Sequence, residues 1–256
     1  MSTKDILKGE LITKEFNHRK VLEDISFSLK EGELLCLLGV SGVGKTTLFN
    51  ILSGISRPDG GSVLLNTSES EEDCWEEITG KSGYLSYMLQ KDLLLPHKYV
   101  IDNVALPLVL KGMKKKDARE KAGSYFKQFG LEGYEKKYPA ELSGGMRQRA
   151  ALLRTFLQGN RVALLDEPFS ALDTITKTAM QEWYLQVMEE IKLSTIFITH
   201  DIDEAILISD RILIMKGSPA ALTEEIVIQK SKPRDSSFTL TEEFIDYKKR
   251  IRESLS

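Results

Sequence analysis

The chain has 256 residues, of which 41% are hydrophobic and 29% are charged, as in an ordinary globular protein. Its formal net charge of -3 excludes a global basic field for nucleic acid. No apolar run approaches the roughly 18 residues that cross a bilayer, and residues 1–5 open no signal peptide. We therefore expect any membrane role to come through a partner. Two cysteines without metal-ligand spacing, Cys36 and Cys74, fit a reduced cytoplasmic setting.

The first third of the chain predicts strands that lead into a glycine-rich loop. Residues 9–38 alternate short apolar runs with turns, and residues 34–38 form a continuous apolar run typical of a strand buried on both faces. The loop is followed by a predicted helix over residues 45–53, which Gly54 is placed to end. Six acidic residues between positions 69 and 77 favour a solvated loop or helix face.

The remaining chain alternates helices and strands. Residues 91–160 have a helical pattern, with a charged amphipathic helix within 111–130. Strands are predicted at 162–165, 195–199 and 211–215, with a helix over 174–192. This order predicts an α/β fold with a largely parallel sheet and helices on both faces. After residue 217 we expect a polar tail with one strand, 225–228, and a final helix.

These patterns predict a division of the chain into three parts. Residues 1–90 and 159–217 form a core that contains the glycine-rich loop, residues 91–158 form a helical insertion, and residues 218–256 form a C-terminal tail. The sequence contains no internal repeat and no low-complexity segment.

The glycine-rich loop fits the phosphate-binding pattern of a glycine, four residues and Gly-Lys-Ser/Thr, between a strand and a helix. Its backbone amides and the helix N-terminus favour an anion. Lys45 is expected to reach the outer phosphates and Thr46 to offer a hydroxyl to Mg²⁺. The alternative is a glycine-rich turn with a chance lysine. The loop comprises Gly39, Val40, Ser41, Gly42, Val43, Gly44, Lys45, Thr46 and Thr47.

An acidic pair follows the predicted strand 162–165. Open parallel sheets bind ligands at the carboxyl ends of their strands, where Asp166 and Glu167 lie. Asp166 suits a place around Mg²⁺, and Glu167 suits the base that orients and deprotonates an attacking water. A solvent-facing acidic pair is the alternative. Pro168 and the run 170–173 after it favour the functional interpretation.

A third motif, the run Leu-Ser-Gly-Gly-Met-Arg-Gln-Arg at 142–149, separates the other two. It resembles the signature of the ATP-binding cassette (ABC) family. Further matches are a glutamine loop at Gln90, an aspartate loop at 170–173 and a switch histidine at His200, all in the family's order and rough spacing. The resemblance covers nearly the whole chain and implies a P-loop NTPase (RecA-like) core, an N-terminal antiparallel β subdomain and an inserted helical subdomain.

The resemblance also implies roles for single residues. Gln90 would ligate Mg²⁺ and sense a membrane partner, and His200 would hold the γ-phosphate of ATP. Asp173 would link two nucleotide sites, and Phe16 is the best candidate to stack on adenine. The signature residues would contact the γ-phosphate of ATP bound to another copy of the chain; they are Ser143, Gly144 and Gly145.

Ser143 is also expected to cap a helix that begins near Met146. Without the resemblance, a structural role at a strand end is plausible for His200, and Gln90 is explained as an ordinary surface residue. A place in the core or on the surface explains Phe16 nearly as well as stacking on adenine.

Within the family, the segments 94–96, 102–108, 166–176 and 199–205 are similar to importers, and the likeness is greatest to ATPase subunits of nitrate, sulfonate, taurine and pyrimidine-precursor importers. The chain departs from these relatives at 97–99 and at 153–156. The similarity implies a homodimer that hydrolyses ATP with Mg²⁺ at the cytoplasmic face of the membrane. It implies permease subunits and, indirectly, an extracytoplasmic solute-binding protein as partners, and no nucleic acid. A soluble ABC ATPase without a membrane partner and a non-hydrolysing regulator are the alternatives.

Overall fold

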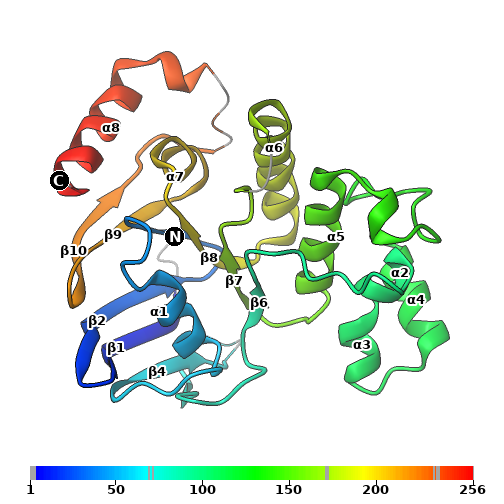
Figure 1. Ribbon diagram of the computed structural model, residues 1–256, viewed down its shortest axis with the longest axis horizontal. Helices are drawn as coiled ribbons and strands as arrows, with labels where there is room; N and C mark the ends of the chain where they lie inside the picture. The colour runs from blue at the N-terminus through cyan, green and yellow to red at the C-terminus, as the bar shows by residue number, and fades with distance from the viewer. Residues whose placement is uncertain are drawn as a thin grey trace.

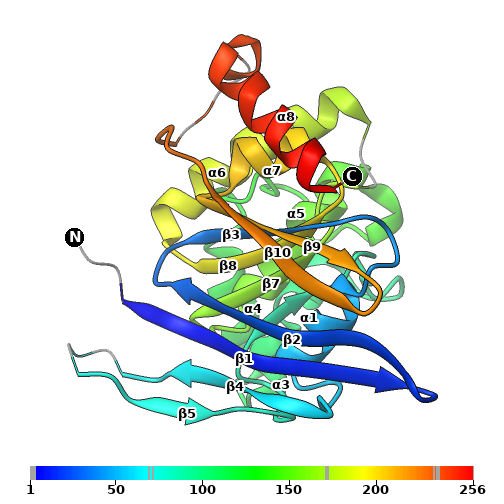
Figure 2. The same cartoon turned by 90° about the vertical axis from the view of Figure 1, so that its left-hand side faces the viewer.

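The computed structural model describes residues 4–68, 70, 72–170, 173–232, 234 and 237–255. Within these residues, ten strands form one sheet in the order β5-β4-β1-β2-β10-β9-β3-β8-β7-β6 (Figures 1 and 2). The strands are β1 (Asp5–Phe16), β2 (Arg19–Lys30), β3 (Leu34–Leu38), β4 (Gly60–Asn66), β5 (Trp75–Glu77), β6 (Ser86–Met88), β7 (Val162–Asp166), β8 (Ser194–Thr199), β9 (Arg211–Gly217) and β10 (Ala220–Val227).

The helices flank this sheet (Figure 1). They are α1 (Lys45–Leu52), α2 (Val100–Val104), α3 (Leu106–Leu110), α4 (Lys115–Gly123), α5 (Gly144–Phe156), α6 (Thr174–Ile191), α7 (Ile202–Ile208) and α8 (Glu242–Leu255), with short 3₁₀ helices at Pro139–Glu141 and Phe238–Leu240. None of the helices in the described part of the chain is both long and apolar enough to cross a membrane.

The sheet has a parallel half and an antiparallel half. Strands β9, β3, β8, β7 and β6 run parallel to one another. Strands β2, β1, β4 and β5 pair antiparallel, and β10 joins the halves by pairing with β9 and with β2. The α/β fold is confirmed. The expectation of a largely parallel sheet holds for one half only, because β1 and β2, and likewise β4 and β5, follow one another without a helix and pair antiparallel.

Alternation along the buried strands divides the core between the two faces of the sheet. Leu35 and Leu37 of β3 pack with Phe49 of α1 in one apolar cluster. Cys36 and Leu38 belong to a second cluster with α5, α6 and α7. Successive strand side chains point to opposite faces, so a continuous apolar run satisfies both clusters. The carboxyl ends of the parallel strands lie at one edge of the sheet. The motif residues follow β3, β7 and β8 at that edge.

The helical region between β6 and β7 is organised around a buried asparagine. Asn103 of α2 is fully buried. Its side-chain oxygen accepts from Leu95 N at 2.6 Å, and its amide donates to the carbonyls of Leu95, Lys98 and Tyr99 at 3.1–3.2 Å. One side chain thus fixes the turn that leads into α2. The helix expected within 111–130 is shorter, at Lys115–Gly123.

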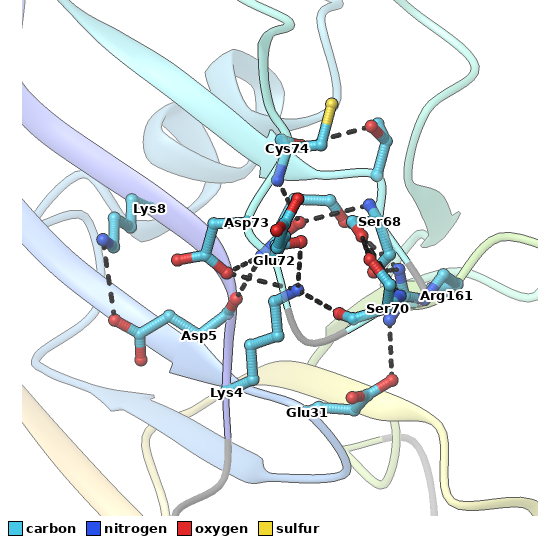
Figure 3. Close-up of polar contacts among 12 residues, drawn as sticks. Lys4, Asp5, Lys8, Glu31, Ser68, Ser70, Glu72, Asp73, Cys74 and Arg161 are labelled. Atoms are coloured by element: carbon cyan, nitrogen blue, oxygen red, sulfur yellow. Dashed lines mark hydrogen bonds and ion pairs between the residues drawn. The ribbon is translucent and has the colours of Figure 1, made fainter.

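Two basic side chains hold the connection between β4 and β5 (Figure 3). Lys4 Nζ donates to the carbonyls of Ser70 and Glu72 at 2.8 and 3.1 Å. Arg161 donates to the carbonyls of Asn66 and Ser68 at 3.2 and 3.1 Å. These bonds replace the backbone partners that a regular strand would supply. The acidic segment expected to be a loop or helix face is a loop that ends in β5, where Asn66, Leu65 and Leu64 provide pairing partners; Glu69 and Glu71 lie outside the described residues.

The predicted core strands and helices agree with the structure to within a few residues. The strand expected at 225–228 begins earlier, at Ala220, because β9 pairs with it along its whole length. The final helix is α8, whose Phe244 and Ile251 are buried against the core. The proposed division into core, helical insertion and tail stays a prediction.

Candidate functional site

The glycine-rich loop turns tightly between β3 and α1. Gly42 and Gly44 have φ angles of 78° and 116°, which L side chains rarely adopt. Gly39 is needed for another reason, because a Cβ there would lie 2.5 Å from the carbonyl oxygen of Met215. The loop therefore passes close to β9 and then delivers the free amides of the first turn of α1 to its hollow side, an arrangement suited to a phosphate group.

Lys45 at the start of α1 points back over the loop. Its side chain is 6% exposed, and Nζ donates to the carbonyls of Gly39 and Val40 at 2.6 and 3.0 Å. Burial lowers the pKa of Lys45, and the carboxylates of Glu167 and Asp166 oppose that shift. The ammonium is thus held inside the loop beside two acidic side chains, where an anionic ligand would stabilise its charge.

Asp166 lies across from the loop at the end of β7. Its Oδ2 accepts from Thr46 Oγ1 at 3.2 Å and from the hydroxyl of Tyr87 at 3.5 Å. Burial raises the pKa of Asp166, with the bond from Thr46 opposing the shift. A hydroxyl and a carboxylate are thereby brought together, as the two motifs predict for a magnesium site.

Glu167 lies between two side chains from other elements. Gln90 Nε2 donates to Glu167 Oε2 at 2.8 Å, and His200 Nδ1 lies 2.9 Å from Glu167 Oε1. Gln90 follows β6, Glu167 follows β7 and His200 follows β8, so three neighbouring parallel strands converge here. Each oxygen of the carboxylate has its own neighbour, an arrangement suited to orienting a base.

His200 lines a small pocket with Glu167. Lys45, Asp166, Glu167 and Gln90 share another pocket, of about 250 Å³. It is lined by Ser41, Gly42, Gly44, Lys45, Thr46, Thr47, Gln90, Asp166, Glu167 and Ile198. A larger pocket, of about 550 Å³, lies where β7 and β8 begin, at the opposite edge of the sheet, and its lining contains none of the motif residues. The chemistry of the lining identifies the pocket that contains Lys45 as the candidate site.

The signature residues are not part of this pocket. Ser143 is exposed and caps α5, its hydroxyl accepting from Met146 N at 3.3 Å, so the helix begins at Gly144 rather than near Met146. Arg147 of the same helix bonds Asp92 at 3.2 Å, two residues beyond Gln90. The structure therefore ties the signature helix to the glutamine loop, while Ser143, Gly144 and Gly145 lie outside the pocket of their own chain.

Phe16 and Asp173 also lie outside the pocket lining. Phe16 ends β1 with 49% of its surface exposed, and Lys14 Nζ lies 5.2 Å from its ring. Asp173 is exposed at the start of α6, and its carbonyl accepts from Lys177 N at 2.8 Å. Ala171 and Leu172 of the same loop lie outside the described residues. Roles for Phe16 and Asp173 stay predictions.

Two polar features of the site were not predicted from the sequence. Tyr87, which bonds Asp166, is one; its position in the segment before Gln90 is the signal that was available. The other is an ion-pair cluster of Lys177, Asp201 and Glu204 beside His200. The sequence shows the acidic residues after His200, but it does not show their basic partner, because Lys177 lies 24 residues before Asp201.

Comparison with known proteins shows the family of the chain. The sequence profile of the ABC transporter family matches residues 22–170. The chain is 41% identical over 217 residues to the formylaminopyrimidine import ATP-binding protein ThiZ of Halalkalibacterium halodurans, covering 84% of this chain and 82% of that protein. It is 37% identical to the aliphatic sulfonates import ATP-binding protein SsuB of Bacillus cereus, covering 95% and 91%.

Solved structures show the same fold. One is a dimeric post-hydrolysis state of an ATP-binding cassette bound to ADP and Pi, which is 25% identical with a TM-score of 0.71 and covers 88% of this chain and 100% of that one. A cassette of Clostridium perfringens, part of an ABC transporter complex, is 23% identical with a TM-score of 0.78 over 97% and 100%. With its phosphate loop, acidic strand end and signature in place, the chain belongs to the ATP-binding cassette family and is an ATPase.

Proposed function

We propose that the chain is the ATP-hydrolysing subunit of an importer for a small solute. Two copies would hold two ATP molecules between the phosphate loop of one and Ser143, Gly144 and Gly145 of the other. The observation that carries this proposal is the placement of Ser143: it caps α5 with an exposed hydroxyl, yet it lies outside the pocket that contains Lys45 and Glu167. The dimeric relative bound to ADP and Pi supports it.

The residues of the pocket fit a magnesium ion. Mg²⁺ prefers oxygen ligands, and Thr46, Asp166 and Gln90 bring a hydroxyl, a carboxylate and an amide to one pocket. Bound there with ATP, the ion would neutralise charge on the phosphate oxygens. Tyr87 would support this set by donating to Asp166.

The chain's own side chains supply the rest of the chemistry. Lys45 and the N-terminus of α1 would bind and orient the phosphates. Glu167 would accept a proton from the attacking water, and Gln90 and His200 would hold its two oxygens in place. His200 would also contact the γ-phosphate. Phe16 would stack on adenine from the end of β1.

Transport requires that ATP favour a closed dimer over an open one, since a ligand shifts an equilibrium only by its differential affinity. Permease subunits would dock near Gln90 and the helical region. Exposed apolar side chains lie there, including Leu89 at 40%, Leu93 at 52% and Tyr99 at 37%. Docking would place the chain at the cytoplasmic face of the membrane, with an extracytoplasmic binding protein as an indirect partner and no role for nucleic acid.

A search of the neighbouring genes for a permease, followed by co-expression of that permease with this chain, tests the transport assignment. We expect the chain to purify with that apolar subunit and to release phosphate from ATP faster in the complex. Purification of an active ATPase that never binds a membrane subunit would favour the soluble alternative. Absence of phosphate release from either form would favour a regulator that uses ATP only as an adhesive.

A further inference from the structure

Lys177 of α6 lies between two segments that the proposed function uses, the loop that contains Asp173 and the strand end that contains His200. We propose that Lys177 is a positioning residue for ATP hydrolysis, which locks the His200 segment onto the first turn of α6. The inference rests on the proposed roles of Glu167 and His200, since Lys177 is not in the pocket that contains Lys45 and acts through its neighbours.

The contacts of Lys177 join both segments directly. Its Nζ lies 2.7 Å from Asp201 Oδ2 and 2.9 Å from Glu204 Oε2. Its backbone N–H donates to the carbonyl of Asp173 at 2.8 Å. One residue therefore ties the start of α6 to Asp201, the immediate neighbour of His200.

Asp201 is itself held at several points. Its Oδ1 accepts from Asp203 N at 2.9 Å and Glu204 N at 3.1 Å, which caps α7. Its backbone N–H donates to Thr199 Oγ1 at 3.0 Å. With Oδ1 occupied by the helix cap, Oδ2 is left for Lys177. The carboxylate of Asp201 thus holds the backbone that follows His200 through two sets of contacts, one to the first turn of α7 and one to Lys177.

Glu204 makes the cluster sensitive to loss of the lysine. Its side chain is 3% exposed, and burial raises its pKa to about 6 although Lys177 opposes the shift. Removing one partner of a buried ion pair leaves the other charge without compensation, so the segment must rearrange or take up a proton. Lys177, Asp201 and Glu204 line the same small pocket as Glu167 and His200, so such a rearrangement reaches the catalytic pair.

In the proposed mechanism His200 holds Glu167, with Nδ1 2.9 Å from Oε1. A displacement of His200 would therefore slow hydrolysis. A displacement of about 1 Å at a catalytic group can cost on the order of 100-fold in rate. ATP binding depends on the phosphate loop, which the cluster does not touch. Loss of Lys177 is therefore expected to lower turnover while leaving ATP affinity in place, a split that general destabilisation does not produce.

The test compares Lys177→Met with Lys177→Arg in the full chain. We expect Lys177→Met to lower kcat for phosphate release by about 10- to 100-fold with ATP affinity changed by less than about twofold. Lys177→Arg should recover most of the rate, since a guanidinium can bond both carboxylates. Lys248→Met is the matched control. It removes the ion pair between Lys248 Nζ and Asp203 Oδ1 of α7, which are 2.6 Å apart, and leaves Asp201 and Glu204 with their partners.

Two further variants separate positioning from stability. The double variant Lys177→Met/Glu204→Gln removes the uncompensated charge, so its melting temperature should return toward that of the unaltered chain while its kcat stays low. Recovery of kcat in the double variant, or an equal loss of kcat in Lys248→Met, would overturn the proposal. If Glu167→Gln and His200→Ala also turn over normally, the proposed function fails; if they are inactive and Lys177→Met is normal, only this inference fails.

Discussion

His200 Nδ1 lies 2.9 Å from Glu167 Oε1, although the two residues are 33 positions apart in the chain. Parallel pairing of β7 with β8 brings them together, since each residue follows the carboxyl end of its strand. Glu167 has a φ angle of 47°, and its N–H donates to the carbonyl of Ile198 at 3.0 Å. A left-handed conformation at a non-glycine residue costs free energy, and here it aims the carboxylate at His200.

Glu167→Gln should separate binding from hydrolysis. The amide keeps the size of the side chain but accepts no proton from water, and loss of a general base typically lowers the rate by about 10²–10⁴-fold. We expect ATP affinity to be retained. Phosphate release and equilibrium binding of a fluorescent ATP analogue measure the two properties, and near-normal turnover would contradict the role of Glu167.

Lys45→Ala should weaken ATP binding itself. The ammonium is buried within the loop. Among the described residues it donates only to the loop carbonyls of Gly39 and Val40, so its charge remains available to phosphate oxygens. Hydrogen bonds to charged groups contribute about 1.5–3 kcal/mol, which corresponds to roughly a 10- to 150-fold loss of affinity. Titration with the same fluorescent analogue measures it. An unchanged affinity would mean that the loop does not hold the phosphates.

Ser143→Arg should abolish turnover while leaving ATP affinity of the isolated chain largely intact, because Ser143 lies outside the pocket of its own chain. A matched control is Ser124→Arg, which places the same charge on an exposed position of the helical region. Phosphate release and nucleotide titration distinguish the two properties. An equal loss of both in Ser143→Arg would argue against a site shared between two copies.

Asn103→Ala should destabilise the helical region. The substitution removes the side-chain partner of Leu95 N and of Lys98 O, whereas the carbonyls of Leu95 and Tyr99 keep bonds from Lys98 N and Asn103 N. Unsatisfied buried groups cost about 1–3 kcal/mol each, so we expect a loss of at least about 2 kcal/mol in the free energy of unfolding. Urea denaturation followed by circular dichroism measures it. A change below about 0.5 kcal/mol would show that water replaces the amide.

Ionisation of Glu204 should make the free energy of unfolding depend on pH. Burial raises its pKa from 4.5 to about 6 in the folded chain, so the folded state binds this proton more tightly than the unfolded state. Its contribution is fully present below pH 4.5 and is lost as pH rises through 6, a decrease of about 2 kcal/mol. The difference in unfolding free energy between the unaltered chain and Glu204→Gln measures this, and a difference independent of pH would contradict it.

Local patterns predicted the parts of the fold whose residues carry their own signal. The apolar runs of β3, β7 and β8 have to be buried on both faces, and the spacing of Gly39, Gly44 and Lys45 specifies a phosphate loop before any contact is known. The cap at Ser143 followed from its place before a helical pattern.

Features set by tertiary contacts were not predictable in the same way. β5 forms because β4 offers an edge, and β10 extends because β9 pairs with its full length. Lys177 reads as one surface lysine among many until α6 packs beside the turn after β8. Local propensity is a weak guide where a neighbouring strand or a distant charge decides the conformation.

The sharing of ATP between two copies is tested most directly by the mass of Glu167→Gln in solution. Sedimentation velocity measures this mass with and without ATP and Mg²⁺, for the chain alone and for the chain bound to its membrane subunits. We expect a dimer that forms with ATP and is lost when Ser143→Arg is added to the same chain. A chain that stays monomeric with ATP in both settings would contradict it.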